Sequence, residues 1–287
     1  MKDRLTLAFF ANASGDLKHK PILVYHSENL RAFKAKNITK DRLLVFWRSN
    51  AKACVTMTIF IEWVNVCFGP AVKNFLEENN LSLKCLLILD NAPAHPPGLK
   101  ANLHPDFCFI KVLYLPPNTT PLLQPMDQSV IGNFKKLYTK HLFKRCFEVT
   151  EITQFTQREF WKEHFDIVQC LKMIDKAWNE VSRCTLNSSW KKLWPAVVAE
   201  CDFKSFEPST EDEAVEDPAF EEVVEEIISI VRSKGLVVDK TNVDNLIDEH
   251  REELTTEDLK ELEAMQLTII QDEENSSGGE DGGPGGD

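Results

Sequence analysis

Short apolar runs alternate with longer amphipathic segments along most of the chain. Apolar residues dominate Leu5–Ala11 and Pro21–His26, and the polar segment between them carries Asn, Ser, Gly and Asp. This pattern predicts two strands joined as a β-hairpin. The runs Leu83–Leu89 and Phe107–Leu115 are short and almost wholly apolar, which is typical of buried strands. The stretch 27–52 is polar, and we assign it no strand.

Helical spacing of apolar residues marks three segments of the same part of the chain. They are 56–80, which the Gly69-Pro70 pair should interrupt, then Ser129–Phe147 and 158–181. Eight of the 14 prolines lie within 93–125, so turns rather than a helix are expected there. Strands that alternate with helices in this order predict an α/β fold.

The charge of the chain divides along its length. The full chain has 33 Lys and Arg against 45 Asp and Glu, for a formal net charge of −12. Residues 207–287 hold 26 of the acidic and five of the basic side chains, a net charge of −21. The remaining 19 acidic and 28 basic side chains give residues 1–206 a net charge of +9. A basic body of this kind is compatible with nucleic-acid binding, although the total charge is negative.

These differences divide the chain into three predicted parts. Residues 1–206 should form one folded domain. Residues 207–271 should form an acidic helical segment, with helices at Ala219–Arg232 and Val243–Leu267. Residues 272–287 are rich in glycine and lack periodicity, so we expect them to be disordered.

Composition also limits the class of protein. The eight cysteines include no CxxC pair, which favours reduced thiols in an intracellular protein over a zinc ribbon or a disulfide framework. The N-terminus lacks the features of a signal peptide, and Glu62 and Asn65 interrupt the most apolar long segment, 53–69. We therefore expect no membrane span.

Two carboxylates stand out by their positions. Asp90 closes an apolar strand, and Asp127 precedes a helix. Ligands gather at the carboxyl ends of strands in α/β sheets, and carboxylates suit hard cations such as Mg²⁺. With a third carboxylate, such a pair can hold two metal ions for phosphodiester chemistry. The alternatives are that Asp90 only starts a turn, that Asp127 only caps its helix, and that nearby His95 is a polar turn residue.

Two unusual blocks around these carboxylates carry a resemblance to a known family. Leu87–Pro96 (LILDNAPAHP) and Leu115–Gln128 (LPPNTTPLLQPMDQ) resemble the DDE endonuclease domain of Tigger/pogo-type transposases. Domesticated relatives of these transposases include the jerky-like proteins and centromere protein B. Shorter matches lie at Lys2–Thr6, Asn12–Gly15 and Phe46–Asn50, and the resemblance covers essentially residues 1–270.

The resemblance implies an RNase H-like fold, in which helices flank both faces of a five-stranded mixed sheet. It implies three carboxylates that hold Mg²⁺ for DNA strand cleavage and transfer, and no small-molecule cofactor. Asp90 matches the second carboxylate and Asp127 the third, while Asn91 and His95 are candidates for supporting residues.

The first carboxylate of the family lies on a strand that precedes the Lys2–Thr6 block. We expect this chain to lack that central strand and therefore to be catalytically incomplete, with unpaired strand edges on both sides. The carboxylates of Asp3, Asp16 and Glu62 do not occupy the first-strand position.

A basic cluster follows the third carboxylate. Residues 128–147 contain no acid, and five cations are candidate DNA contacts: Lys135, Lys136, Lys140, Lys144 and Arg145. The alternative is a solvated helix face. The acidic helices are interpreted as a solvated bundle, as a docking surface for a protein partner, or as a shield over the basic face.

Three hypotheses for function follow. The first is a transposase-derived nuclear protein that binds DNA with an incomplete nuclease site. The second is an active metal-dependent DNA endonuclease, if the natural chain extends upstream. The third is a protein-interaction module that acts through the acidic tail.

Overall fold

The computed structural model describes residues 4–153, 155–198 and 218–248. Three strands form its first sheet: β1 (Leu5–Ala11), β2 (Lys18–Tyr25) and β3 (Phe46–Ser49). β1 and β2 are antiparallel with Leu5 opposite Tyr25, which confirms the predicted hairpin. β2 and β3 are parallel.

The stretch 27–52 differs from its description as polar and without strands. It contains a short helix, α1 (Arg31–Ala35), and the third strand, β3. Phe46 and Trp47 of β3 are almost completely buried. Two neighbouring apolar residues give little periodic signal, so this strand depends on its pairing with β2 rather than on its own pattern.

The other two predicted strands are confirmed and form a second sheet. β4 (Cys85–Leu89) and β5 (Ile110–Tyr114) are parallel, with Leu87 opposite Val112. The resemblance implies one continuous mixed sheet. In the described part of the chain the strands instead form a three-stranded and a two-stranded sheet, and no ladder joins β1 to β4.

The helical segment 56–80 is not interrupted at Gly69-Pro70. α2 (Met57–Trp63) continues through a π-helical turn (Val64–Phe68) into α3 (Gly69–Glu78). Pro70 lies in the first turn of α3, directly after the π-helical turn. A Cβ on Gly69 would lie 2.7 Å from the Phe107 ring, so glycine serves close packing here.

The segment 158–181 is also not one helix. α6 (Gln157–Glu159) and a π-helical turn (Phe160–His164) precede α7 (Ile167–Glu180). Asp166 separates them, because its side chain accepts a hydrogen bond from the Gln169 N–H (2.9 Å) and so caps α7.

Three further helices complete the domain around these elements. They are α4 (Thr120–Leu123), α5 (Val130–Thr153) and α8 (Arg183–Ser188). α5 extends beyond the predicted end at Phe147.

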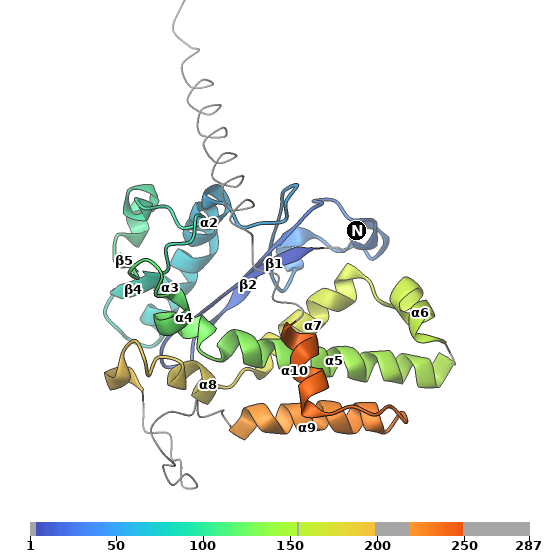
Figure 1. The fold of residues 1–287 in the computed structure, drawn as a ribbon. Coiled ribbons are helices and arrows are strands. Elements are labelled where there is room, and N and C mark those ends of the chain that lie inside the picture. The colour runs from blue at the N-terminus through green and yellow to red at the C-terminus, as the bar shows by residue number, and fades with distance from the viewer. Residues whose placement is uncertain (1–3, 154, 199–217, 249–287) are drawn as a thin grey trace, which may run out of the picture.

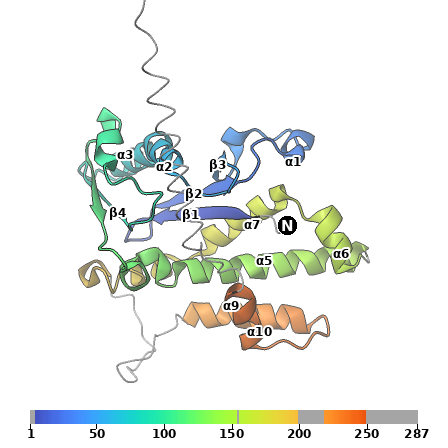
Figure 2. The same ribbon diagram turned by 45° about the horizontal axis from the view of Figure 1, so that its top comes forward.

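The first sheet lies between two helical layers (Figures 1 and 2). On one face, Leu23 and Trp47 pack with α5 and α7. On the other face, Ile22 and Val24 share a core with α2, α3 and the inner side of β4–β5. The helices therefore hold the two sheets together where no strand ladder does.

A helical hairpin forms the outermost layer. α9 (Pro218–Arg232) and α10 (Lys240–Asp248) lie on the side of α5 that faces away from the sheet (Figure 2). α9 agrees with the predicted acidic helix. The rest of the predicted helix Val243–Leu267, the 206/207 boundary and the glycine-rich end lie outside the described residues. None of the helices in the described part is long and apolar enough to span a membrane.

Candidate functional site

Asp90 lies where β4 ends, directly after the buried Leu89. Its Oδ1 accepts a hydrogen bond from the Ala92 N–H (3.1 Å) and lies 2.7 Å from Nδ1 of His95. Burial opposes ionisation of this carboxyl, but the hydrogen bond and charge of His95 outweigh it and lower the pKa of Asp90. Asp90 thus starts a turn, as one interpretation expected, and is also held as a carboxylate.

Neighbouring contacts fix this turn against the sheet. The Asn91 side-chain amide donates to the Leu115 carbonyl (2.7 Å), and the Leu115 N–H donates to the Leu89 carbonyl (2.7 Å). The ends of β4 and β5 are therefore joined at the candidate site. His95 packs its ring against Phe60 of α2, with the ring centroids 4.7 Å apart.

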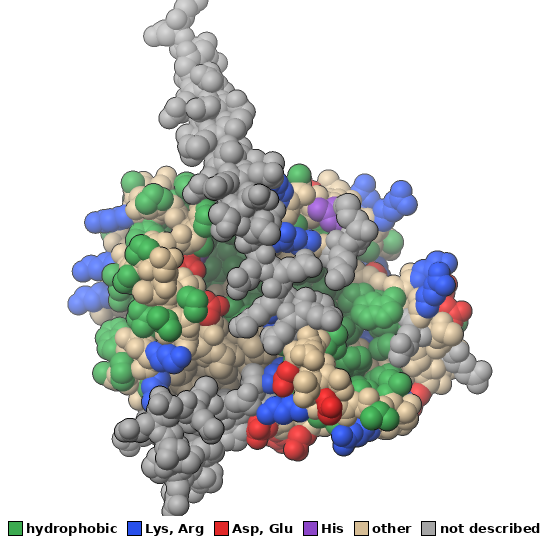
Figure 3. All heavy atoms as spheres, viewed as in Figure 1, with side chains coloured by type: hydrophobic (Ala, Val, Ile, Leu, Met, Phe, Trp, Pro, Cys, Tyr) green, Lys and Arg blue, Asp and Glu red, His purple; other side chains and the backbone are tan. Residues whose placement is uncertain are grey.

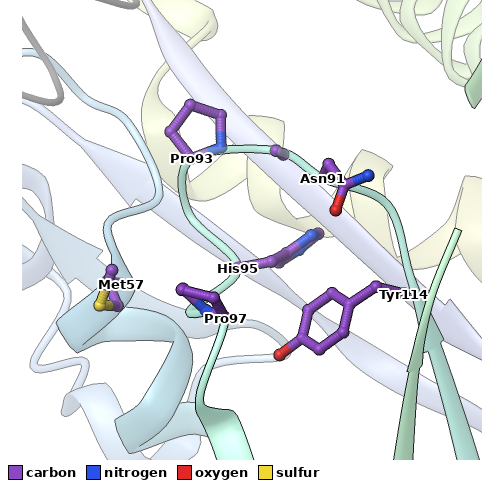
Figure 4. A pocket seen from close by; sticks show the side chains of 7 residues that line it. Met57, Asn91, Pro93, His95, Pro97 and Tyr114 are labelled. Atoms are coloured by element: carbon purple, nitrogen blue, oxygen red, sulfur yellow. The ribbon is translucent and has the colours of Figure 1, made fainter. Parts of the chain in front are cut away.

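A pocket of about 480 Å³ opens beside these residues (Figure 4). Asn91 and His95 line it from the turn after β4, and Tyr114 lines it from the end of β5. Met57, the first residue of α2, lies across the pocket from them. The Tyr114 hydroxyl donates to the Pro96 carbonyl, so this ring is fixed in the wall of the pocket.

Asp127 lies on a separate segment. It ends the 3₁₀ turn Pro125–Asp127, is exposed, and donates its backbone N–H to the Gln124 carbonyl (3.0 Å). Ser129, with φ of 83°, then redirects the chain into α5. The structure thus brings Asp90, Asn91 and His95 together and places Asp127 at the entrance to α5.

The two carboxylates have the donor type that Mg²⁺ prefers, but they do not form a complete metal site. Within the ranges that the structure describes, no group of three or more His, Cys, Asp and Glu side chains is placed to hold a metal. Asp127 therefore does not join Asp90 and His95 in a preformed cluster. The described donors do not fit a two-ion centre, which requires shared carboxylates.

Other carboxylates that could replace a missing ligand are engaged elsewhere. Glu62 forms a paired salt bridge with Arg48, whose Nε lies 2.7 Å from Glu62 Oε2. Asp16 accepts hydrogen bonds from Asn12 and Ser14 in the β1–β2 turn. Asp3 lies outside the described residues.

The basic residues on α5 have unequal environments. Lys136 is 4% exposed, and its Nζ lies 3.4 Å from Asp244 Oδ1 of α10. Lys140 Nζ lies 3.1 Å from Glu226 Oε2 of α9 and 3.1 Å from Glu180 Oε2 of α7. Burial alone would lower the pKa of Lys140, but the hydrogen bonds and charges of these two glutamates raise it.

The other three candidate DNA contacts lie nearer the surface. Lys144 is exposed, Lys135 is half-buried, and Arg145 lies 3.9 Å from Glu148 on the next turn of α5. The sequence pattern did not identify the acidic partners of Lys136 and Lys140. The only available signal was the opposite charge of α5 and the C-terminal helices, which underlies the shielding alternative.

The chain is similar in sequence to a known family and to several known proteins. The sequence profile of the DDE superfamily endonuclease family matches residues 2–190. Human Tigger transposable element-derived protein 7 is 29% identical over 215 residues, which cover 72% of this chain and 38% of the relative. Mouse Jerky protein is 27% identical over 199 residues, which cover 69% of this chain and 32% of the relative. CENP-B homolog protein 2 of Schizosaccharomyces pombe is 26% identical over 180 residues, which cover 62% of this chain and 32% of the relative. No solved structure matches the chain.

Two observations define the class of protein: a mixed α/β domain with a carboxylate at the end of strand β4, and a family profile that matches more than half of the chain. The chain belongs to the DDE superfamily endonuclease family, among its Tigger/pogo-type, transposase-derived members. It spans about a third of the length of these curated relatives.

Proposed function

We propose that this chain is the core of a transposase-derived nuclear protein that binds DNA through its basic surface and whose own residues do not complete the endonuclease site. The observation that carries the proposal is the held Asp90 carboxylate, which has a supporting His95 but no clustered third ligand among the described residues. Asp90 and Asp127 correspond to the second and third carboxylates of the family motif, as the resemblance implies.

DNA is the proposed partner because charge and family agree. Residues 1–206 carry 28 basic and 19 acidic side chains, and the matched family is one of endonucleases. Contacts from Lys and Arg to phosphates position DNA without reading its sequence. Lys144 and Arg145 are proposed as accessible phosphate contacts, with Lys135 beside them. Nuclear localisation follows from this proposed partner.

A salt series tests the proposed DNA contacts. Binding of a 30-base-pair random duplex to the full chain is followed by fluorescence anisotropy. The double variant Lys144→Gln/Arg145→Gln should make the slope of log K against log salt less negative by about 1.8, for two lost phosphate contacts. The matched control is Lys84→Gln/Lys100→Gln, at two exposed lysines outside α5. Equal losses in both double variants would contradict a DNA face on α5.

Plasmid nicking tests the proposed incompleteness of the site. The chain has two of the three family carboxylates, Asp90 and Asp127. We therefore expect the full chain to nick supercoiled DNA in Mg²⁺ or Mn²⁺ no faster than the Asp90→Asn variant does. Metal-dependent nicking that Asp90→Asn abolishes would overturn the proposed incompleteness and favour an active endonuclease. Asp16→Asn, which changes a turn carboxylate, controls for general effects of charge.

A further inference from the structure

The α9–α10 hairpin packs on α5 through an apolar face of its own. Three residues of α9 are at most 3% exposed, and they form a cluster with α10 and with Phe147 of α5: Val224, Ile227 and Val231. Val243 and Ile247 complete the cluster from α10, and Phe143 packs at its edge. Val223 of α9, at the edge of this cluster, also packs against the core that α5 and α7 form with the first sheet. The hairpin therefore docks as a unit on one side of α5.

Carboxylates of the docked hairpin lie directly on the basic residues of α5. Asp244 of α10 pairs with Lys136, and Glu226 of α9 pairs with Lys140. A reverse pair joins Lys234, after α9, to Glu151 of α5. Figure 3 shows acidic and basic side chains intermingled over this part of the surface.

The geometry prevents a second anion from reaching these ammonium groups. The Lys136 side chain is only 5% exposed, and that of Lys140 is 18% exposed. A phosphate would need the positions that Asp244 and Glu226 occupy. A lysine as buried as Lys136 also requires a counter-charge, which Asp244 supplies while the hairpin is docked.

We propose that the α9–α10 hairpin is an internal competitor for polyanions, whose carboxylates occupy the groups of α5 that would otherwise bind phosphate. This inference rests on the proposed DNA-binding function and adds a regulated state to it. With the hairpin docked, DNA reaches only the outer residues of α5. With the hairpin released, Lys136 loses Asp244 and Lys140 keeps only Glu180 of α7, so both ammonium groups are added to the phosphate-binding surface.

A variant that releases the hairpin without changing its charge tests the proposal. In the full chain, Ile227→Asn/Val231→Asn places two amides in the apolar cluster, where they lack partners. Affinity for a 30-base-pair random duplex should rise at least tenfold. The slope of log K against log salt should become more negative by about 1.8, for two added phosphate contacts. Ser229→Asn, on the exposed side of α9, is the matched control and should change neither quantity.

A second pair of variants assigns the gain to the covered lysines. Lys136→Gln/Lys140→Gln should remove the added affinity in the released variant but change binding little when the hairpin is docked. Removing the competing charges alone, with Glu226→Gln/Asp244→Asn, should raise affinity in part. Glu222→Gln/Glu225→Gln, on exposed positions of α9, makes the same change in net charge without touching α5 and controls for long-range repulsion.

The outcomes separate this inference from the function on which it rests. Release is verified independently by faster hydrogen exchange in α9 and α10. If the wild type binds DNA and the released variant binds no better, the hairpin does not compete and the inference is overturned. If neither protein binds DNA at any salt concentration, the proposed DNA-binding function fails, and the inference fails with it.

Discussion

Lys18 shows how one charged side chain can serve the fold rather than a ligand. Its ammonium donates to three carbonyls at the end of α7: Trp178 (2.9 Å), Asn179 (2.8 Å) and Val181 (2.9 Å). These carbonyls have no partners within the helix, and the positive charge complements the negative end of its dipole. Burial, with a smaller contribution from the charge of Arg183, lowers the pKa of Lys18.

Replacing this lysine should therefore destabilise the domain. We expect Lys18→Met to lower the free energy of unfolding by about 2 kcal/mol, because hydrogen bonds to charged groups are worth about 1.5–3 kcal/mol. Urea denaturation of the full chain measures the change. Lys20→Met makes the same substitution at an exposed position of the same strand and should change stability by less than about 0.5 kcal/mol. Equal effects would argue against the capping role.

Gly15 is the residue on which the β1–β2 turn depends. Its φ is +70°, and a Cβ at this position would lie 2.9 Å from both the Cα and the carbonyl oxygen of Arg183 in α8. The turn therefore requires glycine both for its conformation and for its close contact with α8.

Substitution at this turn should be costly. We expect Gly15→Ala to destabilise the protein by about 2 kcal/mol, since it adds strain at a left-handed residue and a contact with backbone that cannot move alone. Thermal unfolding of the full chain measures the loss. Gly98→Ala is the control, because a Cβ on Gly98 meets nothing within 4 Å. A Gly15→Ala protein as stable as the Gly98→Ala protein would contradict the requirement for glycine.

At the scale of elements, Asp166 determines where α7 begins. Its side chain caps the Gln169 N–H and forms an ion pair with Lys36. Burial opposes ionisation, but the Lys36 and backbone hydrogen bonds outweigh it and lower the pKa of Asp166 from its ordinary value of 3.8. A carboxyl whose pKa is lowered on folding stabilises the fold above its unfolded pKa. That stabilisation is lost as the pH falls through the folded pKa.

Two substitutions separate the cap from the charge. Asp166→Asn keeps a capping oxygen and removes the charge, so we expect a loss of a few tenths of a kcal/mol at pH 7 that shrinks as the pH falls below 3.8 toward the lowered folded pKa. Asp166→Ala should lose about 1 kcal/mol more, at either pH, because the cap is gone. Urea denaturation at several pH values measures both. A loss in Asp166→Asn that does not shrink as the pH falls would show that the charge is not its cause.

Elements with a local signal were predicted well from the sequence. The β1–β2 hairpin has alternating strands and a turn within a short segment, and β4 and β5 are compact apolar runs. β3 and the start of α7 were missed for different reasons. β3 has only Phe46 and Trp47 as buried residues, and the apolar periodicity of 158–181 conceals the cap at Asp166.

The candidate site also has a part that the sequence predicts and a part that it does not. Asp90, Asn91 and His95 lie within a few residues of each other, so the sequence could indicate that they form one site. The burial of Lys136 and Lys140 depends on Asp244 and Glu226, which are far along the chain. Periodicity places the lysines on one face of a helix, but it does not tell which element covers that face.

At the scale of the whole molecule, three of the four apolar clusters in the described residues hold the layers together, and they are unequal in size. The two larger clusters enclose the first sheet, and the second of them also contains Leu87, Leu89 and Ile110 of the other sheet. The third cluster joins the α9–α10 hairpin to α5, and Val223 of α9 also packs against the first cluster. The hairpin is attached mainly through this small cluster and a few ion pairs, so its opening exposes little apolar surface. We therefore expect the hairpin to open without the rest of the domain.

Native-state hydrogen exchange of the full chain tests this hierarchy. Amides of α9 and α10 should exchange through local opening, at a free energy several kcal/mol below that of β2. Val224→Ala, in the third cluster, should lower protection in the hairpin by about 2 kcal/mol and leave the amides of β2 unchanged. Leu89→Ala, in the core shared by the two sheets, should lower the free energy of global unfolding by about 2–5 kcal/mol. That loss should appear equally in the globally exchanging amides of both sheets, because one apolar core joins sheets that no ladder connects. If Val224→Ala reduced protection in β2 as much as in α9, the hairpin would be part of the cooperative core, and its release could not occur without unfolding the domain.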